Sequence, residues 1–211
     1  MSTTSERSDT GVLRDYLISF APWIAYILVL QAANSWRFGF AVGLTIAALI
    51  VVMRVTQGDS RFLDVGTLVY CGVMTMVSVL DPTSPLKPYN VPLSLTAIGF
   101  LSVASLLMHS PFTYRIERNH VPAHVLQDSD LHRHFYRVHV IATSSWAVSQ
   151  GTAAAIGAIL IHAKLTPGAT VVQTIGTLTP IGMTRFHHER FLQSVEDERH
   201  GEGAPAQPEP G

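Results

Sequence analysis

Six long apolar stretches constrain this chain more than any other feature of its sequence. A helix needs about 20 mostly apolar residues to cross the hydrocarbon core of a bilayer, and each stretch approaches that length. They cover residues 16–33, 38–53, 62–80, 91–108, 138–162 and 169–184 of a 211-residue chain. Charged residues make up only 14% of the chain, against about 25% in an average soluble domain. The sequence therefore predicts an all-α fold, a polytopic membrane helix bundle with about six transmembrane helices.

The basic residues predict the orientation of this bundle. If the N-terminus is cytoplasmic, the cytoplasmic segments hold eleven of the 14 lysine and arginine residues, and the outer segments hold Arg37, Lys87 and Lys164. Cytoplasmic loops carry an excess of basic residues, and an odd number of spans would break the asymmetry. We therefore expect a multi-pass protein of the cell inner membrane with both ends in the cytoplasm.

The polar ends of the chain are expected to lie outside the bundle. Segments 1–13 and 193–211 are poor in apolar residues and read as disordered cytoplasmic tails. The transmembrane domain then covers residues 14–192. Its sixth apolar stretch is rich in threonine and glycine and is interrupted by Pro180, so a re-entrant or buried segment is the alternative to a full crossing there.

Small residues predict where the helices pack closely. Lipid gives helices no hydrophobic drive to associate, and interfaces in membranes are rich in small residues. Gly39 and Gly43 form a GxxxG pattern in the second stretch, and Ala153 and Gly157 form a small face on the fifth. We expect both faces to contact neighbouring helices.

Few polar side chains inside the stretches could line a substrate path. Asp64 follows Arg61 by three residues, a spacing that lets two side chains pair on one helix face. An ion pair that anchors the helix is the simpler interpretation of Asp64, and a carboxylate that takes part in gating is the functional alternative. Gln150 lies near the middle of the fifth stretch, where an interhelical hydrogen bond is the simpler expectation. With Thr177 and the helix break at Pro180, Gln150 and Asp64 make up the candidate path of a transporter.

The ten histidines are an unusual feature, and most fall on the expected cytoplasmic side. His120 and His124 have the spacing of a helical pair of metal ligands, although Pro122 lies between them, and His132 and His134 follow closely. These four residues are the candidate metal site. Carboxylates at a recognisable spacing are missing, and interfacial histidines are the simpler interpretation.

Other classes of function find no support in the sequence. The only cysteine is Cys71, which excludes an internal disulfide. The net charge is −1, and the sequence has no basic patch that would bind a nucleic acid. We expect no cofactor, and the sequence contains no nucleotide-binding or hydrolase motif. The expected partners are the lipid bilayer, a second copy of the chain, and proteins of the cell envelope or division machinery.

One region resembles a known family. Residues 109–146 contain a Pro-Phe-Thr, a Val-Pro and a tryptophan in the following apolar stretch, at Pro111-Phe112-Thr113, Val121-Pro122 and Trp146. This pattern resembles the small bacterial membrane proteins related to the intracellular septation protein A family. The resemblance implies a multi-spanning inner-membrane protein that maintains the envelope, and it implies no reaction and no catalytic residues.

The same region is expected to form a short interfacial element. Prolines disfavour helix in the residue before them, so a helix in this segment should be interrupted before Pro111 and before Pro122. Phe112, Tyr114 and Ile116 would then lie among the lipid headgroups.

Three functions follow from these features. The first is a structural or scaffold component linked to the cell envelope, with no deep polar cavity. The second is a small transporter or channel, which we expect to be a homodimer because six spans are few for one protomer. The third is a membrane enzyme with a histidine-bound metal at the cytoplasmic face. The absence of catalytic motifs favours a protein that is not an enzyme.

Overall fold

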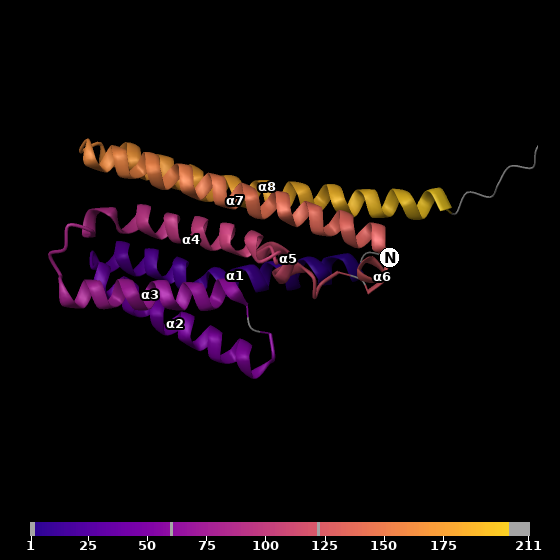
Figure 1. The fold of residues 1–211 in the computed structure, drawn as a ribbon, viewed down its shortest axis with the longest axis horizontal. Coiled ribbons are helices and arrows are strands. Elements are labelled where there is room, and N and C mark those ends of the chain that lie inside the picture. The colour runs from indigo at the N-terminus through magenta and orange to yellow at the C-terminus, as the bar shows by residue number, and fades with distance from the viewer. Residues whose placement is uncertain (1–2, 60, 122, 203–211) are drawn as a thin grey trace, which may run out of the picture.

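The apolar stretches form long helices that run side by side (Figure 1). The computed structural model describes residues 3–59, 61–121 and 123–202, with side chains except at 3–10, 124, 185, 187–189 and 191–202. The long helices are α1 (Thr3–Ala33), α2 (Trp36–Thr56), α3 (Phe62–Leu80), α4 (Asn90–Leu107), α7 (Ser129–His162) and α8 (Thr166–Glu202). Short helices η1 (Lys87–Tyr89), α5 (Phe112–Glu117) and α6 (Ala123–Gln127) lie in the connections. Every regular element in the described residues is helical, which confirms the all-α prediction.

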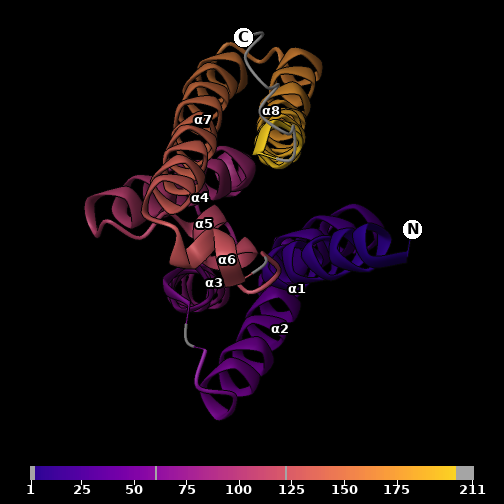
Figure 2. The same cartoon turned by 90° about the vertical axis from the view of Figure 1, so that its right-hand side faces the viewer.

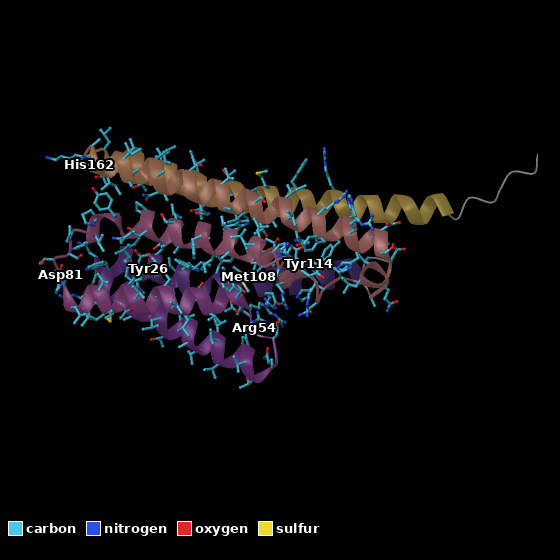
Figure 3. The ribbon with its side chains drawn as sticks, in the orientation of Figure 1. Tyr26, Arg54, Asp81, Met108, Tyr114 and His162 are labelled. Atoms are coloured by element: carbon cyan, nitrogen blue, oxygen red, sulfur yellow. The ribbon has the colours of Figure 1, made fainter. Side chains whose placement is uncertain are left out.

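Five helices are long and apolar enough to cross a membrane. They are α1 from Gly11 onward, α2, α3, η1 together with α4, and α7. Helix α8 is not among the five, since threonines, Gln173 and Pro180 dilute its apolar residues. Asp81, after α3, and His162, at the end of α7, lie at one end of the bundle, while Arg54 of α2 lies toward the other (Figure 3). The structure therefore has the features of a multi-pass membrane protein.

The first and last helices of the chain, α1 and α8, extend further than the apolar pattern indicates. Helix α1 begins at Thr3, inside the segment expected to be a disordered tail, and α8 continues to Glu202, beyond the expected boundary at 193. The physical reason is that extending an existing helix adds one hydrogen bond for each residue that is fixed, whereas starting a helix is costly. A span can therefore propagate into a polar sequence that would not form a helix alone.

The long helices form two units of three. Helices α1, α2 and α3 pack in sequence on one side, and α4, α7 and α8 pack in sequence on the other (Figure 2). Contacts between α3 and α4 join the units, and α5 packs against α1, α4 and α7. The largest apolar cluster lies at this junction and takes residues from both units: Trp23, Leu63, Ile98, Leu101, Phe112, Ile116 and Trp146.

The small residues contact neighbouring helices as predicted. A methyl group added at Gly39 would lie 3.0 Å from the Tyr26 ring, and one added at Gly43 would lie 3.2 Å from the carbonyl oxygen of Pro22. Both contacts are between α1 and α2, where the rings of Tyr26 and Phe40 also stack with centroids 4.3 Å apart. On the other side of the molecule, Gly157 and Ala153 of α7 face α8. The pattern of small residues therefore identifies two real interfaces.

The prediction that residues 112–116 lie among lipid headgroups is wrong. Phe112 and Ile116 are only 3% and 1% exposed and belong to the core cluster. The backbone N–H of Phe112 donates to Ser105 Oγ at the end of α4, which turns α5 back into the bundle. The aromatic and aliphatic residues of α5 therefore face protein, because the junction between the two units needs apolar filling that the long helices do not supply.

A substitution at Gly176 tests the α7–α8 interface. A methyl group at this position of α8 would overlap the Cβ of Ala153 on α7, so Gly176→Ala should lower the unfolding free energy by about 1–3 kcal/mol. Adding Ala153→Gly should restore stability, because the next nearest atom, the Ser149 carbonyl oxygen, is 3.4 Å away. The measurement is thermal unfolding in detergent.

The matched control is Gly182→Ala on the same helix, where an added methyl group meets no heavy atom within 4 Å. Its midpoint should equal or slightly exceed that of the parent protein. Equal losses at positions 176 and 182 would contradict the packing of α7 against α8.

Candidate functional site

A buried cluster of charged side chains lies where α1, α2 and α3 meet. Arg61 Nη2 donates to Asp15 Oδ2 at 2.8 Å, and Arg54 Nη2 lies 3.8 Å from Asp15 Oδ1. The side chains of Asp15, Arg54 and Arg61 are at most 9% exposed. Asp15 comes from α1, Arg54 from the last turn of α2, and Arg61 directly precedes α3. A buried charge requires a partner, so these contacts tie the three helices together at one end.

The turn between α2 and α3 adds a further carboxylate to the cluster. Gly58 has a φ of +70°, and its N–H and that of Asp59 bond to the carbonyls of Val55 and Arg54. This is a glycine-terminated helix end, in which only glycine adopts the left-handed backbone without strain. It places Asp59 Oδ2 at 2.9 Å from Arg61 Nη2 and at 3.4 Å from Arg54 Nη1.

The expected pairing of Arg61 with Asp64 is wrong. Arg61 has an extended backbone before the first residue of α3, so the two residues do not share a helix face. Arg61 turns to Asp15 and Asp59, whereas the carboxylate of Asp64 lies 3.8 Å from Arg54 Nε. Asp64 is fully inside this charged cluster, with a side chain only 2% exposed.

A second buried network joins α1, α5 and α7 close to the first. The Tyr16 hydroxyl donates to Glu117 Oε1 at 2.8 Å, and Glu117 Oε2 lies 3.5 Å from His139 Nε2. The other ring nitrogen of His139 lies 3.1 Å from the hydroxyl of Thr113, which lies 2.9 Å from the hydroxyl of Thr143. Glu117 and His139 are 1% and 2% exposed.

His120 extends the charged cluster toward α5. Its Nε2 atom lies 3.5 Å from Asp15 Oδ2, and Asp15 is the neighbour in sequence of Tyr16, which contacts Glu117. The two networks thus meet on α1, near the end of the bundle where Arg54 and Tyr114 lie (Figure 3). Ionisable residues buried in a membrane protein are functional candidates, and this end is where the chain concentrates them.

The predicted path residues Gln150, Thr177 and Pro180 lie together at the α7–α8 interface, away from Asp64. Pro180 has no N–H to donate to the carbonyl of Gly176, four residues earlier. That carbonyl instead accepts from Ser149 Oγ at 2.8 Å and lies 3.4 Å from Gln150 Nε2. Gln150 therefore helps to satisfy the backbone group that the proline frees, which agrees with the interhelical hydrogen bond expected for it.

The threonines of α8 bond to their own helix. Thr177 Oγ donates to the carbonyl of Gln173 at 2.9 Å, and four others do the same with the residue four positions earlier: Thr170, Thr174, Thr179 and Thr184. A hydroxyl that is bonded in this way can face lipid without an unmet hydrogen bond. These contacts give α8 a surface less polar than its composition indicates.

The candidate metal ligands have different neighbours. His120 lies between α5 and α6, so His120 and His124 do not form a pair on one helix, and the side chain of His124 is outside those described. His120 contacts Asp15, whereas His132 Nε2 lies 3.1 Å from the Tyr114 hydroxyl and His134 is an exposed residue of α7. Among the described residues, no three histidine, cysteine, aspartate or glutamate side chains are grouped so that they could hold a metal ion.

The hollows found on the described surface are apolar and open. One of about 490 Å³ lies between α4 and α7, and one of about 460 Å³ lies along α8. The first is lined largely by small residues, including Thr96, Gly99, Gly151, Ala154 and Ala158, and the second by Ile175, Leu178, Thr179, Gly182, Met183 and Phe186. Neither includes a charged side chain.

Comparison with known proteins adds no relative. No family model matches the chain, and no curated protein or solved structure matches it either.

Removing Pro180 tests the role of its neighbours on α7. Ser149→Ala deletes the shorter donor to the Gly176 carbonyl and should cost about 0.6–1.7 kcal/mol of unfolding free energy. In a Pro180→Ala background the new N–H can bond to that carbonyl, so the same substitution should cost close to nothing. A double-mutant cycle of unfolding free energies measures the difference.

Ser145→Ala is the control for this cycle, because its hydroxyl donates to the Ala142 carbonyl within α7. Its cost should be the same with proline or alanine at position 180. An unchanged cost of Ser149→Ala in the two backgrounds would refute the role assigned to Ser149.

Proposed function

We propose that all six long helices cross the inner membrane, with both ends of the chain in the cytoplasm. The alternating helix directions and the excess of arginine at one end support this arrangement. The contacts of α8 with α7 support the sixth crossing: Gln173 lies beside Gly157, Gly176 beside Ser149, and Thr184 beside Trp146. Residues 173–184 thus lie at the depth of residues 146–157, inside the apolar part of α7.

We further propose that the protein is a structural or scaffold component of the cell envelope. The observation that carries the proposal is that the hollows found in the described bundle are apolar and open, with no charged side chain in their lining. Many buried polar side chains bond to one another or to the backbone, and the atoms that make no hydrogen bond, among them Arg54 Nη2 and the Asp64 carboxylate oxygens, are enclosed by protein and line neither hollow. Such an interior suits a protein that holds a shape in the membrane better than one that passes a polar solute. The resemblance of residues 109–146 to septation protein A relatives supports the link with the envelope and cell division.

A small transporter is the second candidate, and the buried ionisable cluster favours it. Carboxylates, arginines and histidines inside membrane bundles mark ion and proton paths in many transporters. In this chain the network covers one end of the bundle, and the polar contacts toward the other end are between neutral groups: Tyr26 with Asn90 and Tyr70 with Ser94. A homodimer remains the expected form of such a transporter.

Cysteine labelling tests the six-span topology. In a variant in which Cys71 is replaced by serine, single cysteines at Thr83 and Lys164 should react with a membrane-impermeant maleimide in intact cells. Cysteines at Gln57 and Asn119, both exposed, should react only after the cells are permeabilised. Labelling of position 164 only after permeabilisation would mean that α7 does not cross as proposed. Labelling of a cysteine at Arg190 in intact cells would mean that α8 does not cross.

A depletion strain and purified protein in liposomes together test the scaffold role. Loss of the protein should change cell length or septum placement, and a fluorescent fusion should concentrate at division sites. Liposomes that contain the protein should hold a pH gradient and a membrane potential as long as empty ones. Two results together would favour the transporter over the scaffold: a gradient-driven flux in the liposomes that Asp64→Asn abolishes, and normal cell division in the depletion strain.

A further inference from the structure

The Glu117–His139 pair is the buried titratable group that the scaffold role leaves unused. The two side chains come from α5 and α7, and their facing atoms are 3.5 Å apart. Tyr16 of α1 donates to the other oxygen of the carboxylate at 2.8 Å. A pair of apolar residues would fill the same volume without the cost of burying a charge. An ionisable pair at this position therefore suggests a function beyond packing.

The hydroxyl of Thr113 lets this pair exist in two protonation states. Thr113 Oγ lies 3.1 Å from His139 Nδ1 and 3.2 Å from the backbone carbonyl oxygen of His139. With a neutral ring whose proton is on Nε2, Thr113 can donate to Nδ1. With a protonated ring, Nδ1–H donates to Thr113 Oγ, and the hydroxyl proton turns to the carbonyl.

The second hydroxyl in the network serves both states equally. Thr143 Oγ lies 2.9 Å from Thr113 Oγ, which can accept a bond from Thr143 whether or not it also accepts one from Nδ1–H. The change of state therefore requires the rotation of one hydroxyl, and it leaves the hydroxyls of Thr113 and Thr143 and the Nδ1 atom of His139 each with a hydrogen bond. A buried group that can gain a proton without losing a hydrogen bond avoids the usual cost of such a step.

We propose that Glu117 and His139 form a proton-binding site. The proton is taken from the arginine-rich side of the membrane and bonds to Nδ1 of His139, so the pair changes from a net charge of −1 to a neutral carboxylate–imidazolium pair. Glu117 keeps its charge in both states and stabilises the imidazolium as an ion pair, with Oε2 at 3.5 Å from Nε2. The site is argued from the described contacts of α1, α5 and α7, and it stands whether the protein is a scaffold or a transporter.

The surroundings of the pair define what else affects the bound proton. Two titratable side chains contact the pair directly, Tyr16 of α1 and Tyr114 of α5. Asp15 and His120 lie one contact further away, and Arg54, Arg61 and Asp64 of α2 and α3 lie beyond Asp15. The other charged side chains described on α1, α5 and the turn after α5 are Arg14, Arg115 and Arg118. Of the charged side chains after Pro180 on α8, Arg190 is described and lies over the ring of Phe186. Phe135 covers the His139 ring edge to face at 4.4 Å and keeps that side apolar.

Magnetic resonance of the full chain in lipid bilayers, with isotope-labelled histidine, tests the proposal. The ring signals of His139, assigned by their loss in His139→Gln, should change from neutral to imidazolium as the pH is lowered from about 8 to about 5. In Glu117→Gln the midpoint should fall by at least about one pH unit, because a facing negative charge is lost. In Tyr16→Phe it should rise, since the carboxylate loses its other donor.

The His139 midpoint should shift in opposite directions in Glu117→Gln and Tyr16→Phe if the pair binds the proton. A contact that is only structural would leave the midpoint unchanged in both variants. Ser145→Ala, whose hydroxyl bonds within α7, is the control and should leave the midpoint unchanged. Tyr16→Phe keeps its ring and provides the result if Glu117→Gln does not fold. His139 signals that stay constant across the range, or a midpoint that is the same in the parent and both variants, would overturn the proposal.

Discussion

A polar group inside a bilayer has no water to bond, so it depends on a partner supplied by the protein. In this chain the constraint is met at two levels. On α8, the carbonyl that Pro180 leaves without its helical donor accepts from Ser149 and faces Gln150, while the threonines bond to their own helix. At the arginine-rich end, carboxylates and guanidinium groups from α1, α2 and the start of α3 form ion pairs with one another. The fold is held by these internal contacts as much as by apolar packing.

The short helix α5 connects the two halves of the molecule. Its apolar side chains fill the junction between the α1–α3 unit and the α4–α7–α8 unit, and its polar side chains bond to α7 and α1. Thr113 and Glu117 therefore act in packing and in the ionisable network at once.

The long helices could be predicted because apolar length and glycine spacing are local properties of the sequence. The burial of α5 could not, since six residues between prolines look the same whether they face headgroups or a gap between helices. Asp15, Arg54, Glu117 and His139 could not be identified for a similar reason. Asp15, Arg54 and His139 are single ionisable side chains near the end of an apolar stretch, Glu117 lies in the loop between two stretches, and only the fold brings them together. Asp64 and Gln150 were identified by their rarity in a span, although the partners of Asp64 could not be inferred from its neighbours.

Helices α7 and α8 contain 34 and 37 residues, whereas about 20 are enough to cross the hydrocarbon core. Their paired ends extend together at the arginine-rich side of the bundle (Figure 1). From Pro180 to the end of α8 the helix measures about 33 Å, at about 1.5 Å per residue. A proline is where a helix bends most readily. In the proposed topology Pro180 would lie within the membrane, so α8 could act as a lever that pivots at this residue. A tilt of about 10° at that point would move the far end sideways by about 6 Å, which converts a small change among the helices into a displacement that a neighbouring protein could sense.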